Sequence, residues 1–184
     1  MIYKGSTKIK DVYFGSTKIK EIYKGSILVY SSGSYPSGTV LFESATAGTY
    51  TLQVDFNCTV HLDLVGGGGG GYHEFVFSKA GCSGAYISGN MSLTAGIYSI
   101  VIGGGGSGGS NPAKGGSSSF EGNTAGGGGG GNNGSGGTAT VVTQGLTGQN
   151  GKKESTVGWI DGFGAGGSKD GGNGTAGYCK IEVV

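Results

Sequence analysis

Two polar residues on one predicted strand are the first candidates for chemistry. The segment 58–65 alternates apolar and polar residues, so His61 and Asp63 share the face opposite the apolar side chains. A histidine beside a carboxylate can act as a general base. Such a pair also forms on exposed strand faces without a catalytic purpose, and no Gly-x-Ser-x-Gly motif lies in a strand–turn–helix context. We therefore predict no catalytic residue and expect the protein not to be an enzyme.

Glycine and cysteine motifs indicate neither a nucleotide nor a metal. The Gly-x-Gly-x-x-Gly match at 103–108 lacks the following helix that a dinucleotide site requires. Cys58, Cys82 and Cys179 have no CxxC spacing and no associated histidine pattern, which argues against zinc. Their odd number indicates reduced, buried thiols, with a pairing of Cys58 with Cys179 or Cys82 left open. We predict no cofactor and no metal site.

Charge and hydropathy restrict the partners further. The 184 residues carry a net charge of +1 and contain no arginine. Nucleic-acid binders cluster arginine and lysine against phosphates, so we expect no nucleic-acid partner. No apolar stretch approaches the roughly 20 residues of a membrane span, so we expect no membrane insertion. Structured sequence begins directly after Met1 without a secretory signal, which would suit a virion component released by lysis.

Glycine organises the elements that must position any site. All but six of the 46 glycines lie between positions 66 and 177, with runs at 66–71, 103–109, 126–131 and 162–167. Glycine loses more conformational freedom on folding than any other residue. Such runs can order only if their backbones pack together and hydrogen-bond to one another. We predict a packed bundle of polyglycine II helices, which have three residues per turn.

The segments between the runs are predicted to be strands. They alternate apolar and polar residues or contain β-branched and aromatic clusters, and none has helical periodicity. A collagen-like fold is excluded because there is no strict Gly-X-Y register and only two prolines are present. We predict an all-β chain in which residues 39–184 form a β-sandwich-like domain that merges into the polyglycine bundle. The predicted strands are 39–43, 49–54, 58–65, 85–88, 97–102, 139–143 and 176–184.

The first 30 residues are an internal repeat with a period of ten. Each unit contains a β-branched residue followed by tyrosine and then a Gly-Ser turn, which indicates short strands. A unit this small cannot bury its apolar side alone, so residues 1–30 are predicted to stack on one another or on other copies of the chain. Its lysines suggest a DNA-binding arm as an alternative, although a solvated strand face is favoured. Residues 31–38 have the composition of a linker.

Large side chains between the glycine runs are the candidates for a binding site. If the runs form a shaft, the intervening segments emerge at its ends, and aromatic rings there suit recognition of carbohydrate or protein. The candidates are Tyr72, His73, Phe75, Phe77, Trp159 and Phe163. The alternative is that these residues pack over the glycine segments as a hydrophobic cover. That alternative is favoured for the three phenylalanines, and both interpretations stay open for the other three.

The order of these features resembles the glycine-rich domain of phage tail-fibre proteins. A strand pair flows into Leu-Val and six glycines, and later come Gly-Gly-Ser-Ser-Ser-Phe, Thr-Ala followed by six glycines, and a final Gly-Tyr-Cys-Lys-Ile-Glu-Val-Val strand. The resemblance covers about residues 39–184, and the ten-residue repeats are similar to N-terminal segments of phage structural proteins. In the related adhesins that tip the fibres of T-even-like phages, polyglycine II helices form a sandwich whose end loops bind the host receptor.

The resemblance implies a virion fibre or adhesin protein, made in the bacterial host cytoplasm and located on the tail or capsid surface. It would attach the particle to a host cell-surface glycan or outer-surface protein. Residues 1–30 would bind other virion proteins, and a homotrimer is expected, with a monomeric cap as the alternative. A decoration fibre without a specific receptor is the rival interpretation. A surface-glycan depolymerase ranks third, because the eleven acidic residues are scattered rather than paired in a groove.

Overall fold

The computed structural model divides the chain into two compact units, Met1–Tyr35 and Pro36–Val184. It describes residues 33–132 and 134–184 in full and, before residue 33, the backbone of the strands alone. The boundary between the units falls within the segment 31–38, which has the composition of a linker.

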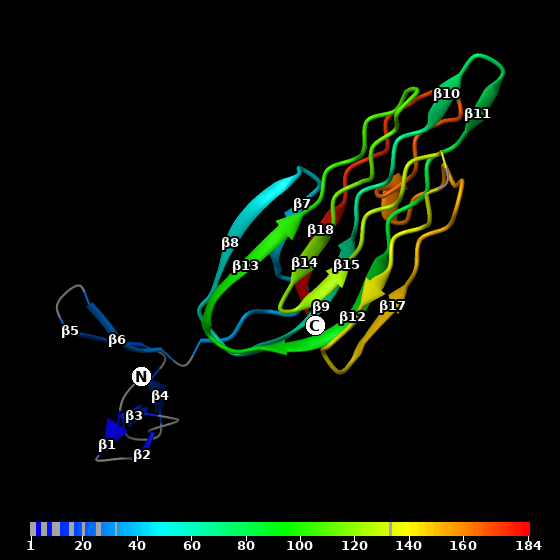
Figure 1. Cartoon of the computed structure of the whole chain (residues 1–184). Helices are drawn as coiled ribbons and strands as arrows, with labels where there is room; N and C mark the ends of the chain where they lie inside the picture. The colour runs from blue at the N-terminus through cyan, green and yellow to red at the C-terminus, as the bar shows by residue number, and fades with distance from the viewer. Residues whose placement is uncertain are drawn as a thin grey trace. The chain divides into compact units, whose positions relative to one another are not determined.

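The first unit repeats one backbone arrangement three times (Figure 1). Each repeat is a two-stranded antiparallel sheet, and the innermost pairs are Lys4 with Thr7, Phe14 with Thr17, and Lys24 with Ile27. The predicted short strands and their ten-residue period are therefore confirmed. The strands are β1 (Tyr3–Lys4), β2 (Thr7–Lys8), β3 (Val12–Phe14), β4 (Thr17–Ile19), β5 (Glu21–Lys24) and β6 (Ile27–Ser31).

The second unit contains two five-stranded antiparallel sheets. The first has the order β17-β12-β9-β18-β7 and the second β16-β15-β14-β13-β8 (Figure 1). Their strands are β7 (Val40–Ser44), β8 (Gly48–Val54), β9 (Cys58–Val65), β12 (Tyr86–Leu93), β13 (Gly96–Ile102), β14 (Ser118–Phe120), β15 (Asn123–Ala125), β16 (Ala139–Thr140), β17 (Leu146–Gln149) and β18 (Tyr178–Val183). Among the described residues there is no α-helix, and the single helical element is the 3-10 helix η1 (Ile160–Gly162). The all-β prediction is confirmed at this level.

The apolar faces of the two sheets form the core. Residues of β9 lie close to β14, and residues of β12 lie close to β15. The period-2 pattern predicted for β9 is confirmed, because Val60, Leu62 and Leu64 are fully buried while His61 on the other face is partly exposed. The other large buried side chains are Ile87, Ile100, Ile102, Phe120 and Ile181.

Several strands were not predicted. The predicted strand at 85–88 is too short, because β12 continues to Leu93 and pairs with β9 along its whole length. The segments 118–120, 123–125 and 146–149 lie outside the predicted strands, but they pair as β14, β15 and β17. These short pieces are rich in Ser, Asn, Thr and Gly, so their strand conformation comes from partners distant in sequence rather than from their own propensity.

Beyond the sheets, the segment Gly66–Gly71 lies at the centre of the other glycine segments. Its six N–H groups donate hydrogen bonds of 2.8–2.9 Å in turn to three neighbours, the segments 82–85, 113–116 and 172–175. Every third residue donates to the same neighbour, with Gly66 and Gly69 bonded to the first of them. Carbonyls of the same run accept from further segments, including 106–109 and 128–131. The six N–H groups of this buried segment and its carbonyls from Gly67 onwards are thus satisfied by other backbone groups.

Close approach explains why these positions are glycine. A Cβ atom at Gly68 would lie 1.8 Å from the carbonyl oxygen of Ala165, and one at Gly69 would lie 2.0 Å from that of Gly129. The other positions of the run are similarly closed, and all six residues are buried. The core therefore continues past the sheets as packed backbone without side chains.

Candidate functional site

A hairpin follows the central glycine segment and projects at the end of the unit (Figure 1). It consists of β10 (Tyr72–Glu74) and β11 (Phe77–Lys79), joined by a two-residue turn. Phe75 and Val76 at its tip are the most exposed large apolar side chains among the described residues, at 91% and 88%, and the neighbouring Phe77 is 70% exposed. The favoured expectation that the two phenylalanines cover the glycine segments is therefore wrong.

The tip contains a strained backbone position. Phe75 has φ = 48°, in the left-handed region that non-glycine residues rarely adopt. Such a conformation costs roughly 1–2 kcal/mol for an L-residue. A glycine would avoid this cost, yet the position carries a bulky, solvent-exposed aromatic. Strain of this kind combined with exposure is typical of a binding element.

The base of the hairpin is tied to the rest of the unit. The His73 amide donates to the carbonyl of Gly109 at 3.1 Å. The Tyr72 hydroxyl donates to Glu74 Oε2 at 2.7 Å, and this hydrogen bond is the largest cause of the raised pKa of Tyr72. Because Tyr72 lies farther from the turn than Glu74, the bond draws the carboxylate back from the tip. The hairpin therefore has an apolar end and a polar base.

Trp159 and Phe163 lie elsewhere. Trp159 stacks on Tyr86 with ring centroids 5.3 Å apart, and its indole Nε1 donates to the carbonyl of Gly84 at 2.8 Å. Phe163 stacks on Tyr178 at 4.9 Å. Tyr86 and Tyr178 are the first residues of β12 and β18, so both stacks lie at the end of this sheet that adjoins the glycine segments. Of the six predicted residues, the structure brings four together on the hairpin and separates these two from them.

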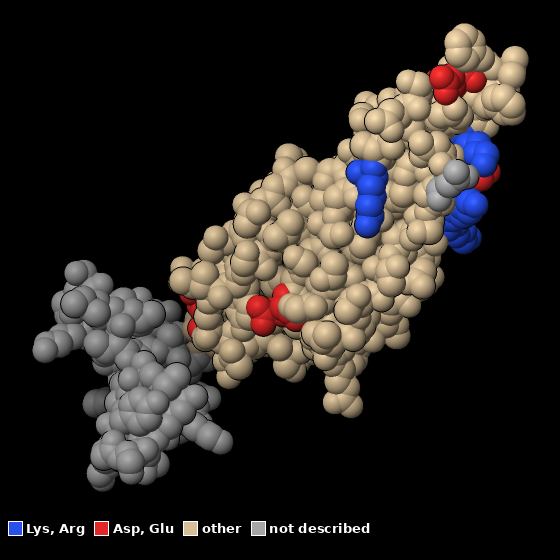
Figure 2. All heavy atoms as spheres, in the orientation of Figure 1, with Lys and Arg blue, Asp and Glu red and all other residues tan. Residues whose placement is uncertain are grey.

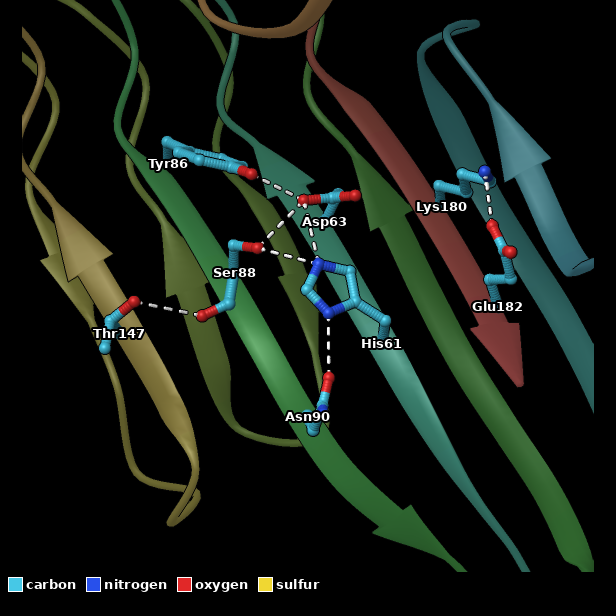
Figure 3. Close-up of polar contacts among 8 residues, drawn as sticks. All are labelled: His61, Asp63, Tyr86, Ser88, Asn90, Thr147, Lys180 and Glu182. Atoms are coloured by element: carbon cyan, nitrogen blue, oxygen red, sulfur yellow. Dashed lines mark hydrogen bonds and ion pairs between the residues drawn. The ribbon is translucent and has the colours of Figure 1, made fainter. Parts of the chain in front are cut away.

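A polar network covers the outer face of β9 and β12 (Figure 3). The Ser88 hydroxyl donates to Asp63 Oδ1 at 2.9 Å and lies 3.1 Å from His61 Nε2. The Tyr86 hydroxyl donates to the same carboxylate oxygen at 2.5 Å, and His61 Nδ1 lies 2.8 Å from Asn90 Oδ1. The sequence indicated only the His–Asp pair. The alternation of Tyr86, Ser88 and Asn90 placed them on one face, but their register against β9 was not readable.

The geometry of this network favours a structural role. The single hydroxyl proton of Ser88 is directed to Asp63 rather than to His61. Strands β9 and β12 each have paired neighbours on both sides, so their amides are used in the sheet ladders rather than aimed at a developing oxyanion. The network therefore links the side chains of paired strands and helps to fix their register.

The three cysteines are free thiols, so the pairings left open from the sequence are not formed. Cys179 is fully buried on β18, and burial raises its pKa from 9.0 to about 12, with the charge of Asp63 adding to the effect. Burial likewise raises the pKa of Cys58. Burial is also the main cause of the raised pKa of Tyr178, whose hydroxyl donates to Glu43 at 2.7 Å.

These shifts predict a loss of stability in alkali. The unfolded Cys179 thiol loses its proton near pH 9.0 while the folded thiol keeps it up to about 12. The contribution of this thiol to the free energy of unfolding is thus expected to stay constant below pH 9.0. It should then fall by up to about 1.4 kcal/mol per pH unit for this thiol alone. Urea unfolding across this range measures the slope. Cys179→Ala is the control, and an identical slope in that variant would contradict the assignment.

In the part of the chain that the structure describes, no group of three or more His, Cys, Asp or Glu residues is arranged to hold a metal ion. Within the described ranges, no helix has the length and apolar character needed to cross a membrane. The hairpin is the feature best suited to contact another molecule.

The fold and the site describe an all-β protein with a glycine core and one exposed apolar hairpin. A family model described as a glycine-rich domain matches residues 44–180, more than half of the chain, and the protein belongs to this family. A comparison with curated proteins found no match.

Proposed function

We propose that the protein attaches a phage particle to the surface of its bacterial host, as a virion fibre or adhesin protein. The hairpin at residues 72–79 makes the contact, and no chemical reaction is required. The observation that carries the proposal is the strained, exposed tip at Phe75, Val76 and Phe77. Supporting it is the resemblance of residues 39–184 to the glycine-rich domain of phage tail-fibre proteins.

The glycine segments serve this function as a rigid support. We propose that they are polyglycine II helices, because the hydrogen-bond partners of the central run repeat every third residue. Backbones locked by bonds to several neighbours cannot bend independently. The hairpin, which directly follows Gly71, is then presented with little loss of entropy on binding.

The repeat unit attaches the protein to the virion. A two-stranded hairpin is marginally stable by itself, and the first unit consists of three such sheets. We propose that residues 1–30 gain stability by stacking on other copies of the chain, as a homotrimer, and on neighbouring virion proteins. Several copies on one particle would multiply a weak affinity for a host glycan or outer-surface protein.

Binding of the labelled full-length protein to a panel of intact bacterial strains tests the proposal. The expected result is saturable binding to a few strains, displaced by excess unlabelled protein. Protein unfolded by heat is the negative control. Binding to no strain, including the phage's own host once it is identified, would overturn the adhesin and favour a decoration fibre.

A further inference from the structure

The charged residues of the second unit are distributed unevenly (Figure 2). We define the glycine half as residues 66–85, 103–117, 126–138 and 150–177. This half contains five of the six lysines that follow residue 35, against four acidic residues, and the remainder contains one lysine against five acidic residues. The five lysines are Lys79, Lys114, Lys152, Lys153 and Lys169, and all are exposed. The half that carries the hairpin therefore holds most of the lysines and has a small positive excess, while the other half is acidic.

The lysines lie on different sides of the central glycine segment rather than on one side of it. The three segments that accept hydrogen bonds from its N–H groups alternate with a period of three, so they lie in three directions around it. Lys114 belongs to one of these segments. Lys152 lies beside the second, where its amide donates to Ser83 Oγ, and Lys169 lies in the turn that leads to the third. The hairpin continues the axis of this ring.

The unit thus ends in an apolar tip, and the lysines lie around the segment behind that tip. This arrangement is complementary to a flat anionic surface that the tip meets first. We propose that the hairpin inserts Phe75, Val76 and Phe77 shallowly into an anionic lipid leaflet while the lysines contact its phosphates. Three residues of strand separate the turn from Lys79, about 10 Å at roughly 3.3 Å per residue. This length matches the ~5–10 Å depth to which interfacial elements enter a membrane.

The polar groups of the hairpin agree with this depth. Tyr72, half-buried at the base, sits where tyrosine is favoured at membrane interfaces. The carboxylate of Glu74, the one acidic group next to the tip, is held back by the Tyr72 hydroxyl. The insertion involves three side chains and no membrane span. It revises the expectation of no membrane insertion, which rested on the absence of long apolar stretches. The inference rests on the proposed function and names anionic lipid, in place of a glycan or an outer-surface protein, as the partner of the same site.

Flotation of the full-length protein with lipid vesicles tests the inference. The anionic vesicles contain phosphatidylethanolamine and phosphatidylglycerol in equal parts, and the reference vesicles contain phosphatidylcholine alone. Wild type is expected to float with the anionic vesicles. The triple variant Phe75→Ser, Val76→Ser, Phe77→Ser should bind at least about tenfold more weakly, because the apolar area that enters the leaflet is removed.

A matched variant controls for the loss of apolar surface. Ile97, Val142 and Val157 are 75%, 67% and 72% exposed and lie outside the hairpin, so replacing all three by serine should leave vesicle binding unchanged. Replacing Lys152 and Lys153 by glutamine should weaken binding to anionic vesicles by about fivefold per lysine. Circular dichroism confirms that each variant is folded.

Failure of the lipid inference is distinguishable from failure of the proposed function. The lipid inference is overturned if wild type does not bind the vesicles, or if the hairpin variant floats with them as well as wild type does. Saturable binding to cells without binding to vesicles would also overturn it, because the partner would then be a host protein or glycan. In that case the attachment function itself would stand.

Discussion

Replacing Gly69 by alanine is expected to abolish the folded state of the second unit. The new Cβ atom would lie 2.0 Å from the carbonyl oxygen of Gly129 and 2.4 Å from its carbon, both backbone atoms of a packed neighbour. No side chain can move aside to relieve this overlap. The segments would have to separate, and the hydrogen bonds from Gly69 to Cys82 and from Gly167 to Gly69 would be lost. The expected cost exceeds about 4 kcal/mol, a large part of a typical domain's stability.

Gly104→Ala is the matched control, because it makes the same chemical change within another glycine run. Its Cβ would meet only the Cβ of Ala47, at an ordinary contact distance of 3.5 Å. Its φ lies outside the left-handed region, so alanine is not strained there. A change within about 1 kcal/mol, in the stabilising direction, is expected from the reduced freedom of the unfolded chain. Thermal unfolding followed by circular dichroism compares the two variants, and equal effects would contradict the packing described.

The second large effect is expected at Asn123, a polar residue with no exposed surface that begins β15. Its Nδ2 lies 3.1 Å from the carbonyl oxygens of Phe120 and Glu121 and 2.9 Å from Thr143 Oγ1, and its two protons are shared among these three acceptors. Its Oδ1 accepts from the amides of Val142 and Thr143 at 3.0 and 3.2 Å. One side chain thus connects the β14–β15 turn to the segment that follows β16.

Asn123→Ala should lower the free energy of unfolding by about 3 kcal/mol or more, because each buried group left unpaired costs ~1–3 kcal/mol. Asn90→Ala is the control. Its exposed side chain forms a hydrogen bond to His61, and its removal should cost less than about 1 kcal/mol. Urea unfolding of both variants measures the difference. Equal losses would show that the buried network is not a major source of stability.

Local patterns in the sequence were sufficient for part of the fold. The alternation in β9 requires only that one face be buried, so the positions of Val60, Leu62 and Leu64 followed directly. The association of the glycine runs followed from backbone hydrogen bonding, since a run such as 66–71 has no other means of becoming ordered. The ten-residue period of the first unit was visible because each repeat contains its own pair of strands.

The features that the sequence did not indicate depend on contacts between residues far apart in the chain. The strand β17 contains Gly148 within a polar segment, and its conformation depends on pairing with β12. Asparagine is a residue type common in turns, and the five hydrogen-bond contacts of Asn123 involve residues up to twenty positions away in the sequence. Neither feature leaves a periodic signal in the sequence.

The candidate site was predictable only as a group of loops. Aromatic residues after a glycine run marked the hairpin, but burial was the reasonable expectation for Phe75 and Phe77, since apolar side chains usually avoid water. Trp159 and Phe163 looked equivalent to them in sequence. The structure distinguishes the pairs, because Tyr86 and Tyr178 provide stacking partners for the latter two.

Host attachment through the hairpin is tested most directly by equilibrium binding of three full-length proteins to a bacterial strain that binds wild type. The three are wild type, the serine variant of Phe75, Val76 and Phe77, and the matched serine variant of Ile97, Val142 and Val157. The predicted result is at least a tenfold loss of affinity, about 1.4 kcal/mol, in the hairpin variant and none in the matched variant. Equal binding by all three folded proteins would contradict attachment through the hairpin.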